Sequence, residues 1–248
     1  MIQDTHEYIA GGYFLSRYLG GFDCTGTVLR KTTLARDHSA RIFFPDSWAL
    51  SWCSLGGEER TVAATKFGIN SQELPNIVDW ADKQFEKTFG VWSVIFMLSD
   101  ARTITRTILK NAVGLDLWGV GLHPQLVETY LALSTPPPQK PGYAPMGASG
   151  THIAMSRHSA PLASGGTVLG YELLVDDIGC GVFNSPESRH IDEDAMYHAL
   201  GISPNSNGLI NSFEEGIACS RYLEQTEVTK SKICGWFPWL IVQYPLEG

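Results

Sequence analysis

The chain has 248 residues, 44% of them apolar, and a formal net charge of −8 from 18 basic and 26 acidic side chains. This length and apolar content predict a globular protein with a sizeable core and exclude a disordered or fibrous chain. The acidic balance, with no basic cluster longer than Arg30-Lys31, argues against nucleic acid as a partner, because neutralising phosphates requires a basic stripe. A basic protein partner fits this charge better.

The compartment is predicted from the N-terminus and the cysteines. The first residues lack the charged and apolar regions of a signal peptide, and no apolar run approaches the length of a membrane span. The five cysteines are odd in number and scattered, without a Cys-x-x-Cys pair. We therefore expect a cytoplasmic protein with reduced thiols and no membrane partner. No cofactor is expected, since the phosphate-loop and dinucleotide fingerprints are missing.

Hydrophobic periodicity and turn residues predict the elements of the first half. Residues 6–19 carry apolar side chains at near-helical spacing, which predicts a helix in spite of Gly11 and Gly12. Further helices are predicted at 58–67, 71–90, 101–110 and 124–133, and strands at 40–45, 46–53, 92–98 and 115–122. The last two strands and the helix between them form a strand-helix-strand unit, which favours a right-handed crossover and parallel pairing.

A proline-rich stretch separates this half from the next. Residues 134–147 hold five of the thirteen prolines. Because proline lacks an amide donor and has a fixed φ, we expect an extended, solvated connector. The predicted organisation is an N-terminal half at 1–133, a connector at 134–150 and a C-terminal half at 151–248. The halves form either two domains or one packed unit.

The second half is predicted to repeat the alternation of helices and strands. Its elements are a helical turn at 152–158, a strand at 167–178, helices at 193–200 and 213–224, and a strand at 239–244. The last strand is strongly apolar and is expected to complete the core. Taken together, the elements predict an α/β fold, with α+β as the alternative, in which a mixed sheet or sheets are covered by helices.

Acidic residues of the second half form the predicted partner-binding patch. They are Asp176, Asp177, Asp192, Glu193 and Asp194. We expect their carboxylates to complement a basic surface on a protein partner. For the last three, helix capping is the alternative, because acidic side chains in a first turn interact favourably with the helix dipole.

An enzyme is the alternative to a binding protein. Cys180, between two glycines, and His190 would act as nucleophile and base of a hydrolase or transferase, with the aspartates before them as orienting groups. If the helix at 193 began early, His190, Asp194 and His198 would share a face and suit zinc or a similar divalent ion. Binding is preferred, because the standard catalytic fingerprints are missing.

Two further groups of residues have structural interpretations. Glu214 and Glu215 are expected to complement the dipole of the helix they open, since adjacent helix residues point about 100° apart and do not pair. The tryptophans at 48, 52, 236 and 239 lie beside prolines at element ends. We interpret them as core residues, with interface anchors as the alternative.

Several short strings carry a resemblance to known proteins. They lie at 45–50, 56–59, 119–122, 169–174, 200–202, 207–210 and 213–215, and in Trp236-Phe-Pro-Trp-Leu-Ile-Val-Gln-Tyr-Pro245. In order and spacing they resemble a bacterial family of uncharacterised cytoplasmic proteins, which supplies no activity or site. Its members look like the stand-alone immunity proteins of bacterial toxin systems in size, acidity and lack of catalytic motifs. The chain departs from the family pattern at Val182-Phe-Asn-Ser185.

This resemblance and the charge lead to one functional hypothesis. The protein is expected to bind and neutralise a protein partner, such as a basic bacterial toxin, in the manner of an immunity-type inhibitor.

Overall fold

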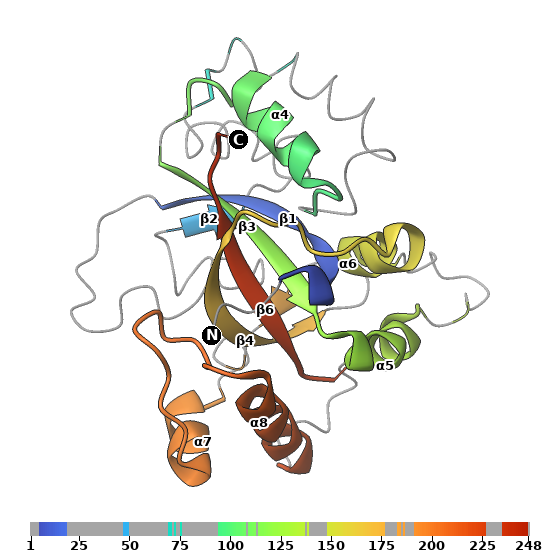
Figure 1. Cartoon of the computed structure of the whole chain (residues 1–248), viewed down its shortest axis with the longest axis vertical. Coiled ribbons are helices and arrows are strands. Elements are labelled where there is room, and N and C mark those ends of the chain that lie inside the picture. Colours follow the sequence, from blue (N-terminus) through green and yellow to red (C-terminus); the bar gives the residue numbers. More distant parts are fainter. Residues whose placement is uncertain are drawn as a thin grey trace.

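A computed structural model gives the fold of the protein. It describes residues 5–18, 47–49, 69–70, 72, 75, 94–107, 109–112, 114–136, 138, 148–176, 183–184, 186, 191–226 and 235–247. These residues form a six-stranded sheet in the order β2-β1-β3-β6-β4-β5, with helices packed on it (Figure 1). The predicted α/β class, a sheet covered by helices, is confirmed.

The central strands of the sheet are buried along most of their length. The strands are β1 (Ile9–Tyr18), β2 (Ser47–Ala49), β3 (Leu115–Leu122), β4 (Thr167–Asp176), β5 (Phe183–Asn184) and β6 (Phe237–Tyr244). Only Asp116 of β3 and Gln243 of β6 are not fully buried, and their side chains are hydrogen-bonded to each other at 3.1 Å. The near-continuous apolar runs of β3 and β6 thus follow from burial on both faces. The strands predicted at 115–122 and 239–244 are confirmed, as is the described part, 167–176, of the strand predicted at 167–178.

The helices begin where side chains can cap them. They are η1 (Thr5–Glu7), α4 (Leu98–Thr107), α5 (Pro124–Ser134), α6 (Gly150–Ile153), η4 (Ala154–His158), α7 (Glu193–Leu200) and α8 (Phe213–Gln225). Ser149, Asp192 and Ser212 each accept a hydrogen bond from the amide three residues ahead, which satisfies an orphan donor of the first turn. The helices expected at 124–133, 193–200 and 213–224 and the helical turn at 152–158 are confirmed.

The helix predicted at 6–19 is wrong, because this segment forms strand β1. Gly12 has φ +129°, outside the helical region, and the ladder to β3 shifts register between Ala10 and Gly12. A side chain at Gly12 would clash with Val94. Tyr13 and Phe14 then point to opposite core layers, as alternation in a strand requires. The helical spacing of apolar residues was therefore a coincidence of a bulged strand.

The parallel crossover predicted for 92–122 is also wrong. From the part of this segment that the structure describes, Ile95 makes only an isolated bridge to Tyr13, with N–H···O distances of 2.7 and 2.8 Å. Helix α4 begins at Leu98, three residues before the predicted start. Both edges of β3 are occupied by antiparallel neighbours, β1 and β6. Each strand ladder within the described ranges is antiparallel, so the expected mixed sheet is an antiparallel one.

The sheet runs without a break through both halves of the sequence. Strand β3 from the first half pairs with β6 from the second, and β6 then pairs with β4. The connector between the halves is packed at its two ends, since Ser134 and Ser149 are buried. Ser134 Oγ lies 2.8 Å from His152 Nδ1, which joins α5 to α6 across the connector. Residues 139–147 of the connector lie outside the described residues.

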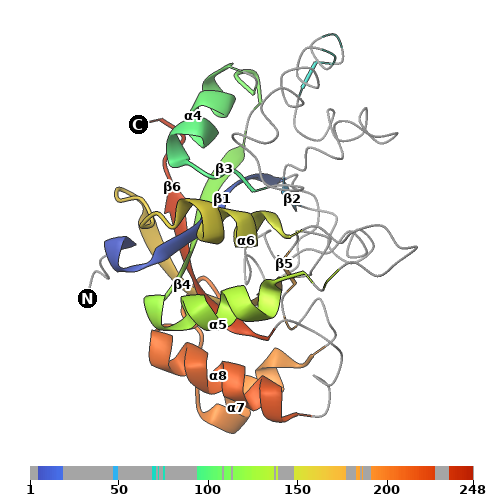
Figure 2. The same cartoon turned by 90° about the vertical axis from the view of Figure 1, so that its right-hand side faces the viewer.

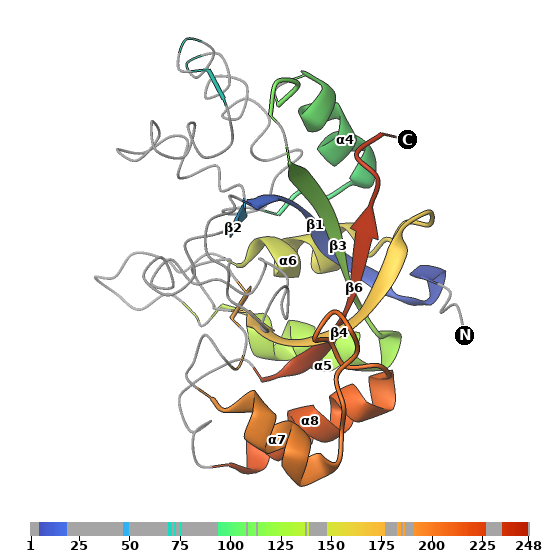
Figure 3. The same cartoon turned by 90° about the vertical axis from the view of Figure 1, so that its left-hand side faces the viewer.

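Two core layers lie on the two faces of the sheet. One contains buried side chains of α4, α7 and α8, such as Ile104, Met196 and Leu223. The other contains Tyr130 of α5 and Met155 of η4. Figure 2 shows α5 and α6 in front of the sheet, and Figure 3 shows β3, β4 and β6 from the opposite side. Helix α4 lies at one end of the long axis, and α7 and α8 lie at the other (Figure 1).

The core interpretation of the tryptophans is confirmed where their side chains are described. Trp236 and Trp239 are both buried, the latter in edge-on contact with Tyr130 at 5.2 Å between ring centroids. Such edge-to-face pairs add to the stability gained from burying the rings. Trp48 lies in β2, and the position of its side chain is not described. Trp52 lies outside the described residues. The helices predicted at 58–67 and 71–90 also fall almost entirely outside the described residues.

Candidate functional site

The predicted acidic patch is only partly a surface feature. Asp192 and Asp194 are exposed, and Asp192 Oδ1 accepts the Ala195 N–H at 2.9 Å as the N-cap of α7. Glu193, in contrast, is 8% exposed and belongs to the buried side of the helix. Asp176 ends β4 opposite Phe183, and Asp177 lies outside the described residues. Capping and surface charge are therefore combined at the start of α7.

Exposed carboxylates gather on α7 and α8. We call this region the acidic end and define it by Asp192, Asp194, Glu214 and Glu224, all of them exposed. Arg221 is the only Lys or Arg in the two helices. Figure 1 shows α7 and α8 side by side at one end of the molecule, so these charges share one region of the surface. Carboxylates of one sign on two neighbouring helices create a negative potential that attracts cations.

Helix α4, at the other end of the long axis, carries the opposite sign. Helix α4 contains Arg102 and Arg106, and Lys110 follows it, against the single acid Asp100 in the same stretch. Arg102 Nε donates to the Pro245 carbonyl at 3.3 Å, which ties the helix to the end of β6. Helix α4 is thus basic, whereas α7 and α8 at the other end of the long axis are acidic. A charged partner would approach in a preferred orientation.

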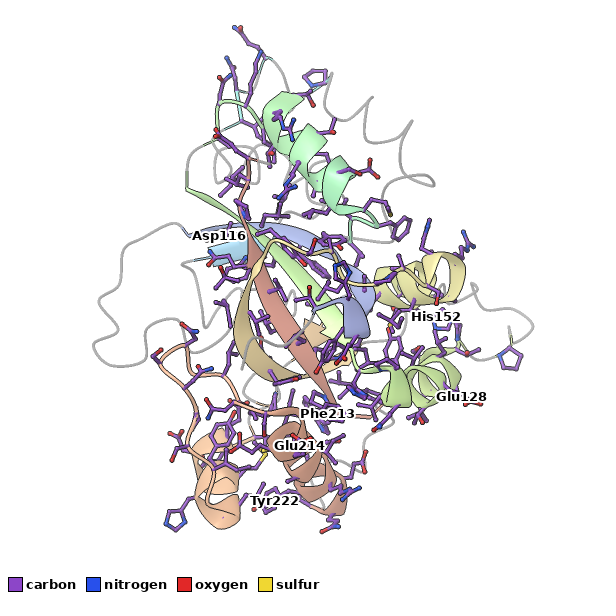
Figure 4. The ribbon with its side chains drawn as sticks, in the orientation of Figure 1. Asp116, Glu128, His152, Phe213, Glu214 and Tyr222 are labelled. Atoms are coloured by element: carbon purple, nitrogen blue, oxygen red, sulfur yellow. The ribbon has the colours of Figure 1, made fainter. Side chains whose placement is uncertain are left out.

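The start of α8 is fixed by a reciprocal pair of hydrogen bonds. Ser212 Oγ accepts the Glu215 N–H at 3.2 Å, and Glu215 Oε2 accepts the Asn211 N–H at 3.2 Å. This arrangement closely resembles a capping box and confirms the capping role predicted for Glu215. Glu214, one residue earlier, stays exposed at the surface (Figure 4). The chain therefore uses one carboxylate to start the helix and presents the other to solvent.

Four aromatic rings meet beside Glu214. His123 and Phe213 are stacked, with centroids 4.2 Å apart and planes at 23°. Tyr8 lies edge-on to His123 at 5.6 Å, and Tyr171 closes the cycle at 6.2 Å from Tyr8 and 6.3 Å from Phe213. We call these four residues the ring cluster. Tyr8 and Tyr171 are buried, whereas His123 and Phe213 are half-exposed, so the cluster has an inner and an outer pair.

The inner pair is joined through its hydroxyl groups. The Tyr8 and Tyr171 oxygens are 2.5 Å apart. Burial raises the pKa of Tyr8, the hydrogen bond to Tyr171 opposes this, and the nearby carboxylates of Glu7 and Glu214 raise the pKa further. Both carboxylates therefore lie close enough to the ring cluster to act on it. The Tyr8 hydroxyl stays protonated at neutral pH.

The outer pair is positioned by helix starts. His123 precedes α5, and its Nδ1 accepts the Gln125 N–H at 3.3 Å, so we assign the ring proton to Nε2. Phe213 is the first residue of α8, directly after its N-cap. Figure 4 places Phe213 and Glu214 next to each other where α8 meets the lower end of the sheet. Neither ring depends on a flexible loop for its position.

The residues of the enzyme hypothesis are not brought together in the described structure. Cys180 and His190 lie outside the described residues, and Asp194 and His198 are both exposed on α7. Within the ranges given above, no three His, Cys, Asp or Glu side chains are arranged to hold a metal ion. Cys219 is buried on α8, and burial raises the pKa of its thiol to about 12, so it behaves as a small apolar side chain.

Sequence reasoning missed the ring cluster. Tyr8 and Tyr171 are 163 residues apart, and no local periodicity reports such a contact. A weaker signal was present at His123, which stands between a strand and the helix-starting Pro124 and so occupies an N-cap position. The cluster itself follows only from the pairing of β1 with β3, β3 with β6 and β6 with β4.

Comparison of the chain with protein-family models, with curated proteins and with solved structures found no significant match. Among the described helices, none has the length and apolar character needed to cross a bilayer. Any function must therefore be argued from the residues described above.

Proposed function

We propose that this protein binds a basic protein partner through the acidic end and neutralises it, in the way that an immunity protein neutralises a bacterial toxin. The observation that carries the proposal is the charge of α7 and α8. Their exposed carboxylates, Asp192, Asp194, Glu214 and Glu224, are opposed by Arg221 alone within the two helices. Such a surface attracts a basic partner over a distance of about one Debye length, roughly 8 Å at physiological salt.

The acidic end is also rigid enough to serve as an interface. Met196 anchors α7 in the core, and Cys219 and Leu223 anchor α8. A Cβ at Gly216 would lie 2.5 Å from the Pro238 Cβ, so α8 packs directly on the start of β6. Carboxylates held on anchored helices lose little conformational entropy on binding, which favours affinity.

Capture followed by footprinting tests the binding site. The tagged protein is used to capture its partner from a lysate of the host, and amide hydrogen exchange is measured with and without that partner. We expect a partner rich in Lys and Arg and new protection within 191–226. Helix α4, at 98–107, is the internal control, because it carries the opposite charge. Protection confined to α4, with 191–226 unchanged, would contradict the proposed site.

Neutralisation needs a separate assay, because binding alone does not inhibit. Cells that express the captured partner alone are expected to stop growing, and co-expression of this protein is expected to restore growth. A variant with the four carboxylates of the acidic end replaced by amides should restore growth less well, since it loses the charge that recruits the partner. Equal growth with and without this protein would contradict the neutralising role.

A further inference from the structure

The outer pair of the ring cluster is partly accessible at the surface. His123 and Phe213 are half-buried and stacked, while Glu7 and Glu214 are exposed. Glu7 precedes Tyr8 and Glu214 follows Phe213 in the chain, and both carboxylates raise the pKa of the Tyr8 hydroxyl. The surface therefore combines a flat aromatic pair with negative charge close by.

This combination favours a planar cation. A cation over an aromatic face is attracted by the ring quadrupole, and a guanidinium can also stack on the ring and donate hydrogen bonds to carboxylates. An ammonium is compact and strongly hydrated, so it gains less from stacking. Anions are disfavoured by Glu7 and Glu214.

We propose that an arginine side chain of the basic partner binds on the stacked rings of His123 and Phe213, with its guanidinium beside the carboxylates of Glu7 and Glu214. The inference rests on the proposed function, because the arginine belongs to the partner bound at the acidic end. The bound arginine would be the anchor of that interface, that is, its strongest single contact. Arginine and aromatic side chains are the residues that most often dominate binding energy. The general charge of α7 and α8 recruits the partner, and the rings select arginine.

Two peptides of equal length and charge test the selection directly. One carries four arginines separated by glycine and serine, and the other carries four lysines at the same positions. Calorimetry or ligand-induced NMR shifts give their dissociation constants with the full-length protein. We expect the arginine peptide to bind about threefold or more tightly than the lysine peptide, the size expected of one exposed cation–π contact. Equal binding of the two peptides would overturn the proposal.

Variants of the two rings that keep the fold test whether the rings cause the preference for arginine. Phe213→Leu retains an apolar side chain against the core, and His123→Asn retains an acceptor for the Gln125 N–H. Both are expected to remove the preference for arginine while leaving charge-driven binding of both peptides. Denaturant unfolding confirms that each variant is folded. A preserved preference in either folded variant would overturn the assignment of that ring.

Two matched charge variants distinguish the arginine site at the rings from the overall negative charge of α8. Glu214→Gln and Glu224→Gln each remove one exposed charge from α8, but only Glu214 lies beside the rings. We expect Glu214→Gln to weaken the arginine peptide several-fold more than Glu224→Gln does. Equal effects would show that only the net charge of the helix matters and would contradict the proposed arginine site.

The captured partner distinguishes failure of the anchor from failure of the proposed function. If exchange protection falls within 191–226 but Phe213→Leu leaves the partner's affinity unchanged, the anchor is wrong and the proposed function stands. If protection falls elsewhere while the peptides still show a ring-dependent preference for arginine, the proposed function is wrong and the arginine site stands.

Discussion

At the centre of the sheet, β3 and β6 are buried along almost their whole length, whereas α7 and α8 place exposed carboxylates at one end of the molecule (Figure 1). The sheet has little tolerance for added atoms: a Cβ at Gly119 would lie 2.7 Å from the Tyr244 ring. At the acidic end, Glu214 and Glu224 are free of such packing. Close packing and exposed surface charge are thus concentrated in separate regions, so most of the surface charge can be changed with little effect on the core.

The largest expected effect comes from filling space in the sheet. Gly12→Ala combines a forbidden φ of +129° with a clash against Val94, and we expect it to lower the free energy of unfolding by about 3 kcal/mol. Gly114→Ala is the matched control, since Gly114 has φ +69° but no neighbour within 4 Å, and should cost about 1 kcal/mol. Urea unfolding measures both. Equal losses would show that close packing around Gly12 is not what constrains β1.

A smaller effect is expected at the start of α8, where the two regions meet. Ser212→Ala removes the acceptor for the Glu215 N–H, and a lost N-cap typically costs about 1 kcal/mol of stability. Ser206→Ala, in the exposed loop before it, should change stability by less than about 0.5 kcal/mol. Chemical denaturation distinguishes the two. If both variants are as stable as the wild type, helix capping does not fix the acidic end.

The smallest effect concerns pH and the contact between α5 and α6. Burial lowers the pKa of His152, so near pH 6.5 the unfolded chain binds more protons at this residue than the folded protein. Its contribution to stability is therefore present above about pH 6.5 and is lost as the pH falls through the folded pKa. His152→Asn keeps a polar group near Ser134 Oγ but does not titrate, and should flatten this part of the stability profile. An unchanged profile would exclude His152 as its source.

The sequence predicted helices best where a clear helical periodicity of apolar residues began at a proline or a capping side chain. Helices α5, α7 and α8 were predicted to within one residue, since Pro124, Asp192 and Ser212 mark their starts. The same helical periodicity explains why Glu193 was wrongly placed in the acidic surface patch. Glu193 and Met196 are three residues apart, so they share a helix face, and both are buried. Strand β1 was missed because Gly12 takes its conformation from packing against Val94, which lies 82 residues further along the chain and outside any local window.

The most direct test of the account measures association rate and stability on the same variant. Asp192→Asn, Asp194→Asn, Glu214→Gln and Glu224→Gln are combined, since asparagine still caps α7. Arg106→Gln with Lys110→Gln at the α4 end is the control. With the captured partner at low salt, we predict about tenfold slower association for the first variant, a difference that shrinks as salt is raised, and an unfolding free energy within about 1 kcal/mol of wild type. An unchanged association rate at low salt would contradict the account.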